Sequence, residues 1–382
     1  MKFRVERDAL ADAVAWTARA LPPRPAVPVL AGLLLEVDGS ALGVSGFDYE
    51  VSTQVGLEVH ASTAGRALVS GRLLADITKA LPPHPVDVAV DGPKLTIACG
   101  AARFTLPTMP VEDYPSLPAM PTTAGSVDSE EFAHAVAQVA VAAGRDDTLP
   151  MLTGVRLEID GDRIILAATD RYRLAARELA WKPEQDGISQ AVLVPAKTLD
   201  ATAKTLTGGP RVTLALSSGG AGEGIIGFSG GAPRSAGTAS RRTTTRLLDA
   251  EFPRYQSLWP AEFAATAELT VAPLVEAVKR VALVADRGTP VRMEFGEDGG
   301  VTLSAGGDDE GLAEEQLEVS MEGEPMTVGF NPSFLLDGLA ALDTEVVTLS
   351  FTTSIKPAVL TGKESQSDYR YLIMPVRLPG AV

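Results

Sequence analysis

The feature that most constrains this sequence is an internal repeat. The segment PVLAGLLLEVDG begins at Pro28, and PMLTGVRLEIDG begins at Pro150, 122 residues further on. Proline, leucine, glycine, glutamate and aspartate match between the two copies. A third, weaker copy begins with TPVRMEF at Thr289. Because self-similarity at a fixed interval marks one structural unit used several times, the sequence predicts three domains of one design.

Helical segments recur in step with the repeat. The apolar spacing predicts a first helix in each copy over 7–21, 129–139 and 271–281, and a second near 71–79, 195–204 and 331–339. In the first of these helices, Leu10, Val14 and Thr17 fall on one face. Ser129, followed by two glutamates, is typical of an N-cap with acids in the first turn.

Short alternating runs lie between the helices. The segments 86–90 (VDVAV) and 94–98 (KLTIA) are joined by an Asp-Gly turn, which is typical of antiparallel strands. Each copy also closes alike, with 103–106 leading to DYPSLP, 245–248 to EFPRYQSLWP, and DYRYLIMPVRL at 368–378. The predicted fold class is therefore α+β, with three repeated domains that each place two helices against antiparallel sheets. We expect the domains to span 1–121, 122–255 and 256–382.

Net charge and composition bound the function only loosely. A net charge of −16 argues against tight nucleic-acid binding, but screening beyond about 10 Å makes local charge decisive. No run approaches the roughly 18 apolar residues of a membrane helix, and charges interrupt the N-terminus where a signal peptide would be apolar. The single cysteine, Cys99, lies in an apolar strand-like run and is expected to be a buried thiol. We expect a cytoplasmic protein without a membrane partner.

No familiar catalytic or metal-binding constellation stands out. The three histidines, His60, His84 and His134, lack the spacing of metal ligands and are expected to be structural. No GxxxxGK[ST] phosphate loop occurs. The sequence therefore predicts no catalytic residue, no metal and no cofactor.

Two weaker patterns leave alternatives open. Residues 222–227 fit GxGxxG, but they lie in the Gly/Ser-rich tract 217–232, which favours a hairpin over a nucleotide-binding turn. An enzyme that binds a nucleotide through this tract remains the alternative function. The acidic residues 308–310, followed by Glu314 and Glu315, lack the spacing of a calcium loop and indicate a solvated turn.

The closing sequence YLIMPVRL at 371–378 resembles the C-terminus of the bacterial DNA polymerase III beta subunit family, the sliding clamps. Matching motifs run through nearly the whole chain: RPAVPVL at 24–30, ATDRYRL at 168–174, FPRY at 252–255 and GFNPSFL at 329–335. The Ala- and Pro-rich composition resembles that of actinobacterial members. The resemblance implies a non-enzymatic, nucleoid-associated homodimer. Its six domains would close head to tail into a ring around duplex DNA, with helices lining the hole.

The resemblance also assigns residues to the ring. Those that match DNA-facing positions are Arg24, Arg72, Lys79 and Lys197. Those that match the dimer interface are Phe104 and Leu106 in the first domain, and Ala282 and Leu283 in the third. The expected DNA contacts are independent of base sequence.

A peptide-binding cleft between the second and third domains is the other expected site. It would bind short segments of the replicative polymerase, the clamp loader, repair polymerases and other clamp-motif proteins. The matching residues are Leu152, Thr169, Tyr172, Arg173, Leu174, Pro253, Leu258, Asn331, Phe334, Ile355, Leu372, Met374, Pro375, Val376 and Arg377. Arg173 and Arg377 are expected at the polar rim of an apolar pocket.

The chain departs from the family pattern in three places. Residues 379–382 extend past the usual end, Ala282 replaces a larger aliphatic residue, and the helices at 129–141 and 331–341 lack the expected lysines and arginines. The net charge of −16 leaves open a clamp-like scaffold that does not encircle DNA.

Overall fold

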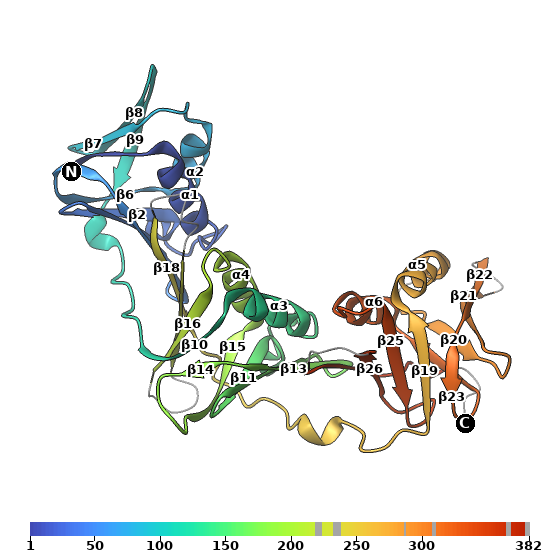
Figure 1. The fold of residues 1–382 in the computed structure, drawn as a ribbon. Coiled ribbons are helices and arrows are strands. Elements are labelled where there is room, and N and C mark those ends of the chain that lie inside the picture. The colour runs from blue at the N-terminus through green and yellow to red at the C-terminus, as the bar shows by residue number, and fades with distance from the viewer. Residues whose placement is uncertain (218–223, 232–237, 286–287, 308–310, 364–367, 379–382) are drawn as a thin grey trace. The chain divides into compact units, whose positions relative to one another are not determined.

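The computed structural model describes the chain except for residues 218–223, 232–237, 286–287, 308–310, 364–367 and 379–382 (Figure 1). The chain divides into two compact units: 1–133, 181–188 and 197–249 form the first, and 134–180, 189–196 and 250–382 form the second. The division runs through the middle repeat, so the domain boundaries at 121 and 255 remain a prediction. In the described part, no helix is long and apolar enough to span a membrane.

The first unit contains one continuous antiparallel sheet. In spatial order its strands are β14 (Lys182–Pro183), β10 (Thr122–Asp128), β16 (Arg211–Leu216), β17 (Ile225–Gly230), β18 (Thr238–Arg246), β4 (Val51–Glu58), β3 (Ala41–Phe47), β2 (Gly32–Asp38), β6 (Gly65–Ser70), β9 (Ala102–Met109), β8 (Lys94–Cys99), β7 (Val86–Asp91), β1 (Lys2–Val5) and β5 (His60–Thr63). The pairing of β18 with β4, which sets Thr245 opposite Val51, joins the first and middle repeats.

Two helices of the first unit pack together on this sheet. α1 (Arg7–Ala18) contacts α2 (Gly71–Ala80) and the strands β2, β3 and β4 (Figure 1). The predicted inner face of α1 is confirmed, because Leu10, Val14 and Thr17 are buried. The helix ends earlier than predicted. Pro22 and Pro23 follow it, and a proline clashes with the carbonyl four residues before it and restricts the residue that precedes it.

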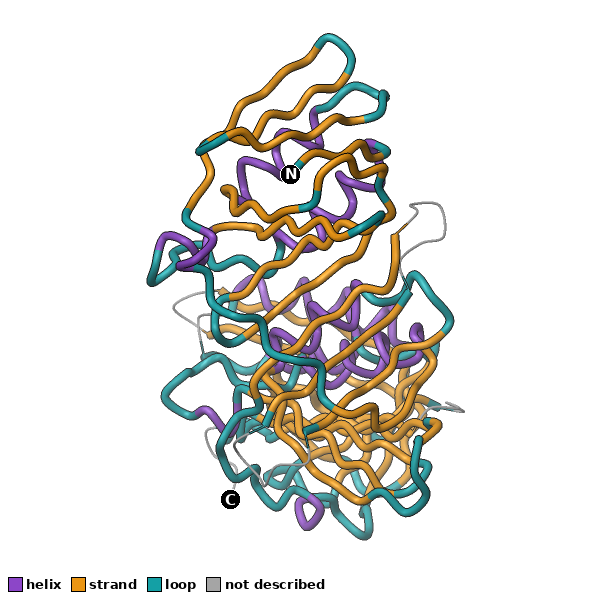
Figure 2. The backbone as a smooth tube through the Cα atoms, turned by 90° about the vertical axis from the view of Figure 1, so that its left-hand side faces the viewer, coloured by secondary structure: helices purple, strands orange, loops and turns teal. Residues whose placement is uncertain are grey.

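The second unit contains two antiparallel sheets, and strands dominate its backbone as they do in the first unit (Figure 2). The larger sheet consists of β15 (Ser189–Pro195), β11 (Gly154–Asp160), β12 (Arg163–Thr169), β13 (Arg173–Ala180), β27 (Asp368–Ile373), β26 (Ala358–Gly362), β25 (Val346–Phe351), β19 (Ala265–Thr270) and β23 (Ser320–Glu322). The smaller sheet consists of β22 (Gly311–Glu318), β21 (Gly300–Gly307), β20 (Val291–Phe295) and β24 (Met326–Phe330). α5 (Val271–Val281) contacts α6 (Pro332–Ala340) and the strands β21 and β22.

The remaining helices, α3 (Ser129–Ala140) and α4 (Ala196–Thr205), belong to the middle repeat. The cap of α3 differs from the prediction. Asp128, one residue earlier, accepts hydrogen bonds from the backbone N–H groups of Glu130 and Glu131, both at 3.0 Å. The Ser129 hydroxyl instead donates to the carbonyl of Gly209. Ser129 is therefore not the N-cap, because its side chain is used in a long-range contact.

The repeat is visible in matching turns. Asp48 follows β3 and Asp170 follows β12, and each carboxylate accepts the backbone N–H groups two and three residues later, at 2.7–3.1 Å. The residue after each aspartate, Tyr49 or Arg171, has a positive φ of 77° or 78°. Non-glycine residues rarely adopt this conformation. The two aspartates are 122 residues apart, the interval between the first two copies of the repeat, so the shared geometry supports that repeat. The second of these turns leads directly into the candidate site.

Candidate functional site

The pairing of β13 with β27 brings two distant parts of the second unit together. Leu174 lies opposite Leu372 in the register, and both side chains are buried. Beyond the paired strands, the backbone N–H of Met374 donates to the carbonyl of Tyr172 at 2.8 Å. Predicted peptide-binding residues from two repeats therefore become neighbours through backbone hydrogen bonds.

An aromatic pair lies at the end of this junction. The ring of Tyr172, whose side chain is exposed (57%), stacks on the ring of Phe334 with centroids 6.1 Å apart and planes 26° apart. Phe334 is in the first turn of α6, where the Asn331 side chain accepts hydrogen bonds from the N–H groups of Ser333 and Phe334, at 2.9 and 3.3 Å. Asn331 therefore fixes the start of the helix that presents Phe334.

Arg173 is not the rim residue that we expected. It is only 5% exposed, and its guanidinium bonds to Asp170 at 2.9 Å, to Asp337 at 2.5 Å and to the hydroxyl of Tyr371 at 3.4 Å. Burial disfavours its charge, but the oxygens of Tyr371, Asp337 and Asp170 outweigh burial and raise the pKa of Arg173 above its usual value. The guanidinium of Arg173 therefore links β13 to α6 and β27 and is shielded from solvent. Arg377 is exposed, as a rim residue must be.

The other predicted peptide-binding residues divide by exposure. Leu152 and Thr169 are buried, and the Thr169 hydroxyl donates to the carbonyl of Arg173 at 2.7 Å. Both residues are therefore part of the packed interior and do not face a bound peptide. Pro375 and Val376 are half-buried, and the Val376 N–H donates to the carbonyl of Gly329 at 2.8 Å. The members exposed to solvent are Tyr172, Pro253, Leu258, Ile355, Met374 and Arg377.

A basic groove of about 600 Å³ lies between α1 and α2 in the first unit. The predicted DNA-facing residues Arg72 and Lys79 line it, together with Arg7 and Arg19, which the sequence analysis missed. Ala11, Ala15 and Arg19 are four residues apart, so they lie on one face of the helical segment. This spacing could have placed Arg19 at the groove from the sequence alone. Arg24 is exposed in the adjoining proline-rich loop. Lys197, the fourth predicted residue, is exposed on α4.

The described residues include several open strand edges, and two of them, those of β9 and β22, concern the predicted dimer residues. β9 pairs with β8 along its length but with β6 only at Thr108 and Met109, and β22 pairs with β21 alone. Exposed strand edges favour pairing with another chain.

The predicted dimer residues lie on or beside these two strands. Phe104 on β9 is half-buried, whereas Leu106 is 1% exposed and lies in the core of its own unit. A buried side chain adds no area to a dimer contact, so Leu106 could contribute to the predicted interface only through the backbone of β9. Next to β22, Ala282 is half-buried and Leu283 is 83% exposed, and Leu312 on β22 is a further exposed leucine that the sequence analysis missed.

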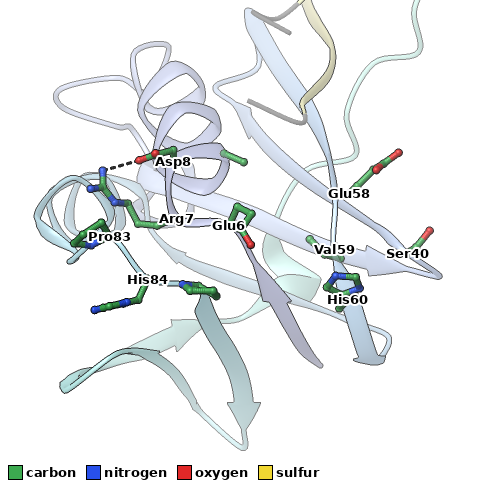
Figure 3. A pocket seen from close by; sticks show the side chains of 11 residues that line it. Glu6, Arg7, Asp8, Ser40, Glu58, Val59, His60, Pro83 and His84 are labelled. Carbon is green, nitrogen blue, oxygen red and sulfur yellow. Dashed lines mark ion pairs between the residues drawn. The ribbon is translucent and has the colours of Figure 1, made fainter. Parts of the chain in front are cut away.

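Two of the histidines line one pocket of about 660 Å³ in the first unit. His60 and His84 share it with the start of α1, where Arg7 forms an ion pair with Asp8 at 2.7 Å (Figure 3). His134 pairs with Asp343 at 3.0 Å in the second unit. In the described parts of the chain, no three His, Cys, Asp or Glu side chains are placed to hold a metal ion. Cys99 is buried, as expected.

The GxGxxG match does not have the geometry of a nucleotide-binding turn. Residues 222 and 223 lie outside the described part of the chain, and Ile225–Gly230 form β17, which pairs with β16 as a hairpin. A dinucleotide-binding turn must open a helix whose N–H groups meet the phosphates, and a strand cannot supply them. Of the acidic cluster, 308–310 also lie outside the described residues, and Glu315 forms an ion pair with Arg280 at 2.6 Å.

Comparison with known proteins assigns the family over nearly the whole chain. Models of the DNA polymerase III beta subunit match at 1–118 (N-terminal domain), 126–254 (central domain) and 256–377 (C-terminal domain). The beta sliding clamp of Streptomyces coelicolor is 58% identical over 100% of both chains, and the beta sliding clamp homolog GriR of Streptomyces muensis is 46% identical over 99% of both.

Solved structures agree with this assignment. A DnaN sliding clamp (DNA polymerase III subunit beta) from Pseudomonas aeruginosa bound to griselimycin has a TM-score of 0.89 and 28% identity, covering 99% of this chain and 100% of that one. The DNA polymerase III beta subunit of Thermotoga maritima has a TM-score of 0.88 and 27% identity, covering 99% of each chain. The matches confirm the three-domain α+β prediction and the resemblance, and this chain belongs to the DNA polymerase III beta subunit family, the beta sliding clamps.

Proposed function

We propose that two copies of this chain close head to tail into a ring around duplex DNA and tether a replicative polymerase and other DNA-processing proteins to it. The polymerase, the clamp loader and repair polymerases would share one surface, formed by Tyr172, Leu258, Ile355, Met374 and Arg377. The chain would act in the cytoplasm, on the nucleoid.

The observation that carries the tethering role is the exposed apolar surface at the β13–β27 junction. Tyr172 and Met374 are exposed there, yet their backbones are hydrogen-bonded to each other and Phe334 supports the tyrosine ring. Large apolar side chains held rigidly at the surface are typical of sites that bind a peptide anchor. We propose that griselimycin, found on the Pseudomonas aeruginosa clamp, binds this chain at the same surface.

Ring closure would allow an acidic protein to hold DNA. The chain carries a net charge of −16, and α3 exposes Glu130 and Glu131, so tight binding by charge alone is unfavourable. A closed ring needs only weak phosphate contacts, and the Arg72 and Lys79 groove would supply them. The open edges of β9 and β22 support closure, because head-to-tail contacts between two copies would pair both edges.

We further propose that the chain has no catalytic activity of its own. The alternative, an enzyme that binds a nucleotide through the tract 217–232, would need a helix after the glycines, where β17 is a strand. Titration with dinucleotides tests this alternative. Saturable binding that depends on residues 222–227 would favour the enzyme.

The decisive experiment compares retention on circular and linear DNA. The clamp is loaded onto nicked circular DNA, unbound protein is removed, and half of the sample is linearised. We expect retention on the circle and rapid loss from the linear form, because a ring slides off a free end. Equal retention on both forms would exclude topological tethering, while binding to neither would exclude a ring around DNA.

A further inference from the structure

We infer that Asp337 is a positioning residue of the peptide-binding surface, which acts through Arg173 to hold the rings of Phe334 and Tyr172 in place. Asp337 is not among the residues that the family resemblance assigns to this surface. The inference rests on the proposed function, since it assumes that Tyr172 contacts the bound partner.

The first step is the link between α6 and β13. Nη1 of Arg173 lies 2.5 Å from Oδ2 of Asp337, and Nε of the same arginine lies 2.9 Å from Oδ2 of Asp170. A planar guanidinium held at two corners by carboxylates has little rotational freedom. Asp337 therefore fixes the plane of Arg173 relative to the helix.

The second step is the link from the guanidinium to the exposed ring. Cζ of Arg173 lies 4.4 Å from the centroid of the Phe334 ring, within the range of a cation–π contact. Phe334 in turn stacks on Tyr172. Asp337 and Phe334 are three residues apart on α6, so they share one helix face. A continuous series of contacts thus connects a carboxylate to the exposed ring of Tyr172.

The first unit contains a similar brace, that is, an arginine that joins a helix carboxylate to an aromatic ring of the same helix, but without an exposed ring. Nη2 of Arg241, on β18, lies 2.6 Å from Oδ2 of Asp12, and its Cζ lies 5.4 Å from the Trp16 ring. Asp12 and Trp16 are four residues apart on α1, and Trp16 is buried. The brace therefore does not itself require an exposed aromatic side chain. In the second unit the exposed ring of Tyr172 also stacks on Phe334, and this ring provides the surface that a partner can contact.

A fluorine probe at Tyr172 tests the positioning role without a ligand. The full-length protein is labelled with 3-fluorotyrosine at 172, and the ¹⁹F signal is compared in Asp337→Asn, Asp337→Glu and Asp12→Asn. We expect Asp337→Asn to move the signal towards that of free 3-fluorotyrosine, and Asp337→Glu to restore much of the parent signal. Asp12→Asn, which weakens the matched brace, should lower the melting temperature but leave the signal unchanged. An unchanged signal in Asp337→Asn overturns the inference.

Calorimetric titration with griselimycin then tests the consequence for binding. We expect Asp337→Asn to weaken affinity about tenfold, the scale of a hydrogen bond to a charged group, and Asp12→Asn to change it less than about twofold. In a Tyr172→Ala background, Asp337→Asn should add less than about a further twofold loss. An equal loss in both backgrounds would show that Asp337 does not act through the ring. If the parent chain does not bind griselimycin, the proposed surface fails, and the fluorine signal still decides the role of Asp337.

Discussion

Burial perturbs tyrosine hydroxyls in both units. It raises the pKa of Tyr114 to about 12, and it raises the pKa values of Tyr255 and Tyr371 well above the usual value of about 10. Each hydroxyl therefore binds its proton more tightly in the folded chain than in the unfolded chain. The stability that depends on these protons is fully present below about pH 10 and is lost as the pH rises through the folded-state values.

The dependence of stability on tyrosine protonation can be tested at Tyr114. It packs in the core of the first unit with Val29, Phe47 and Leu68. We expect the free energy of unfolding to fall above pH 10, with Tyr114 accounting for roughly 2 kcal/mol of the loss by about pH 11.5. Urea unfolding from pH 8 to pH 11.5 measures the decline. Tyr114→Phe, which cannot ionise, should show a shallower decline, and identical slopes in the two proteins would contradict the assignment.

At the scale of single elements, the cap of α3 yields a second prediction. The Asp128 carboxylate accepts two backbone N–H groups that would otherwise lack a partner inside the helix. We expect Asp128→Ala to lower the free energy of unfolding by about 1 kcal/mol, and Asp128→Asn to lower it much less, because asparagine also caps well. Denaturant titration compares the three proteins. A loss as large in the asparagine variant would mean that capping is not the cause.

The sequence predicted elements best where local pattern decides them. α5 spans Val271–Val281, as the apolar spacing predicts, because one face of it packs in the core. The cap of α3 was assigned to the wrong residue because the Ser129 hydroxyl contacts Gly209, 80 residues away. No local pattern reveals a contact of that separation.

The candidate site shows the same division between pattern and tertiary structure. Tyr172 and Met374 could be placed by motif, and the structure makes them neighbours. The burial of Arg173 could not be predicted, because it depends on Asp337, 164 residues further along the chain. The burial of Leu106 likewise depends on which face of β9 packs against the core. The alternation of residues along the strand shows that one face is buried, but it does not show which one.

For the whole molecule, an uneven distribution of charge is expected to govern contact with DNA. Arg7, Arg19, Arg72 and Lys79 gather at one groove of the first unit in a chain of net charge −16. Each phosphate contact contributes about 0.9 to the slope of log affinity against log salt. Contacts concentrated in the first unit should therefore dominate the salt dependence.

Replacement of Arg19 tests this distribution. We expect Arg19→Gln to weaken binding to a short duplex and to reduce the salt slope by roughly one per chain. Fluorescence anisotropy between 50 and 200 mM salt measures the slope. Arg163→Gln is the matched control, since Arg163 is an exposed arginine of the second unit that pairs with Glu178. Equal effects of the two substitutions would argue against a special role for the groove.

Ring closure is a property of the whole molecule that depends on two strand edges. Leu283, at 83% exposure, lies beside the open edge of β22, and Phe104 lies on the open edge of β9. A head-to-tail dimer would cover both side chains, and burying a charge there without a partner is strongly unfavourable. Leu283→Asp should therefore convert the dimer to a monomer.

Light scattering after size exclusion measures this change. The mass should fall from about twice 39.8 kDa to 39.8 kDa, and retention on nicked circular DNA should be lost. Leu258→Asp places the same charge on an exposed leucine of the predicted peptide-binding surface, so it should leave the dimer intact while it weakens griselimycin binding. A Leu283→Asp protein that stays dimeric would place the interface elsewhere. A monomer that is still retained on the circle would show that retention does not require the ring.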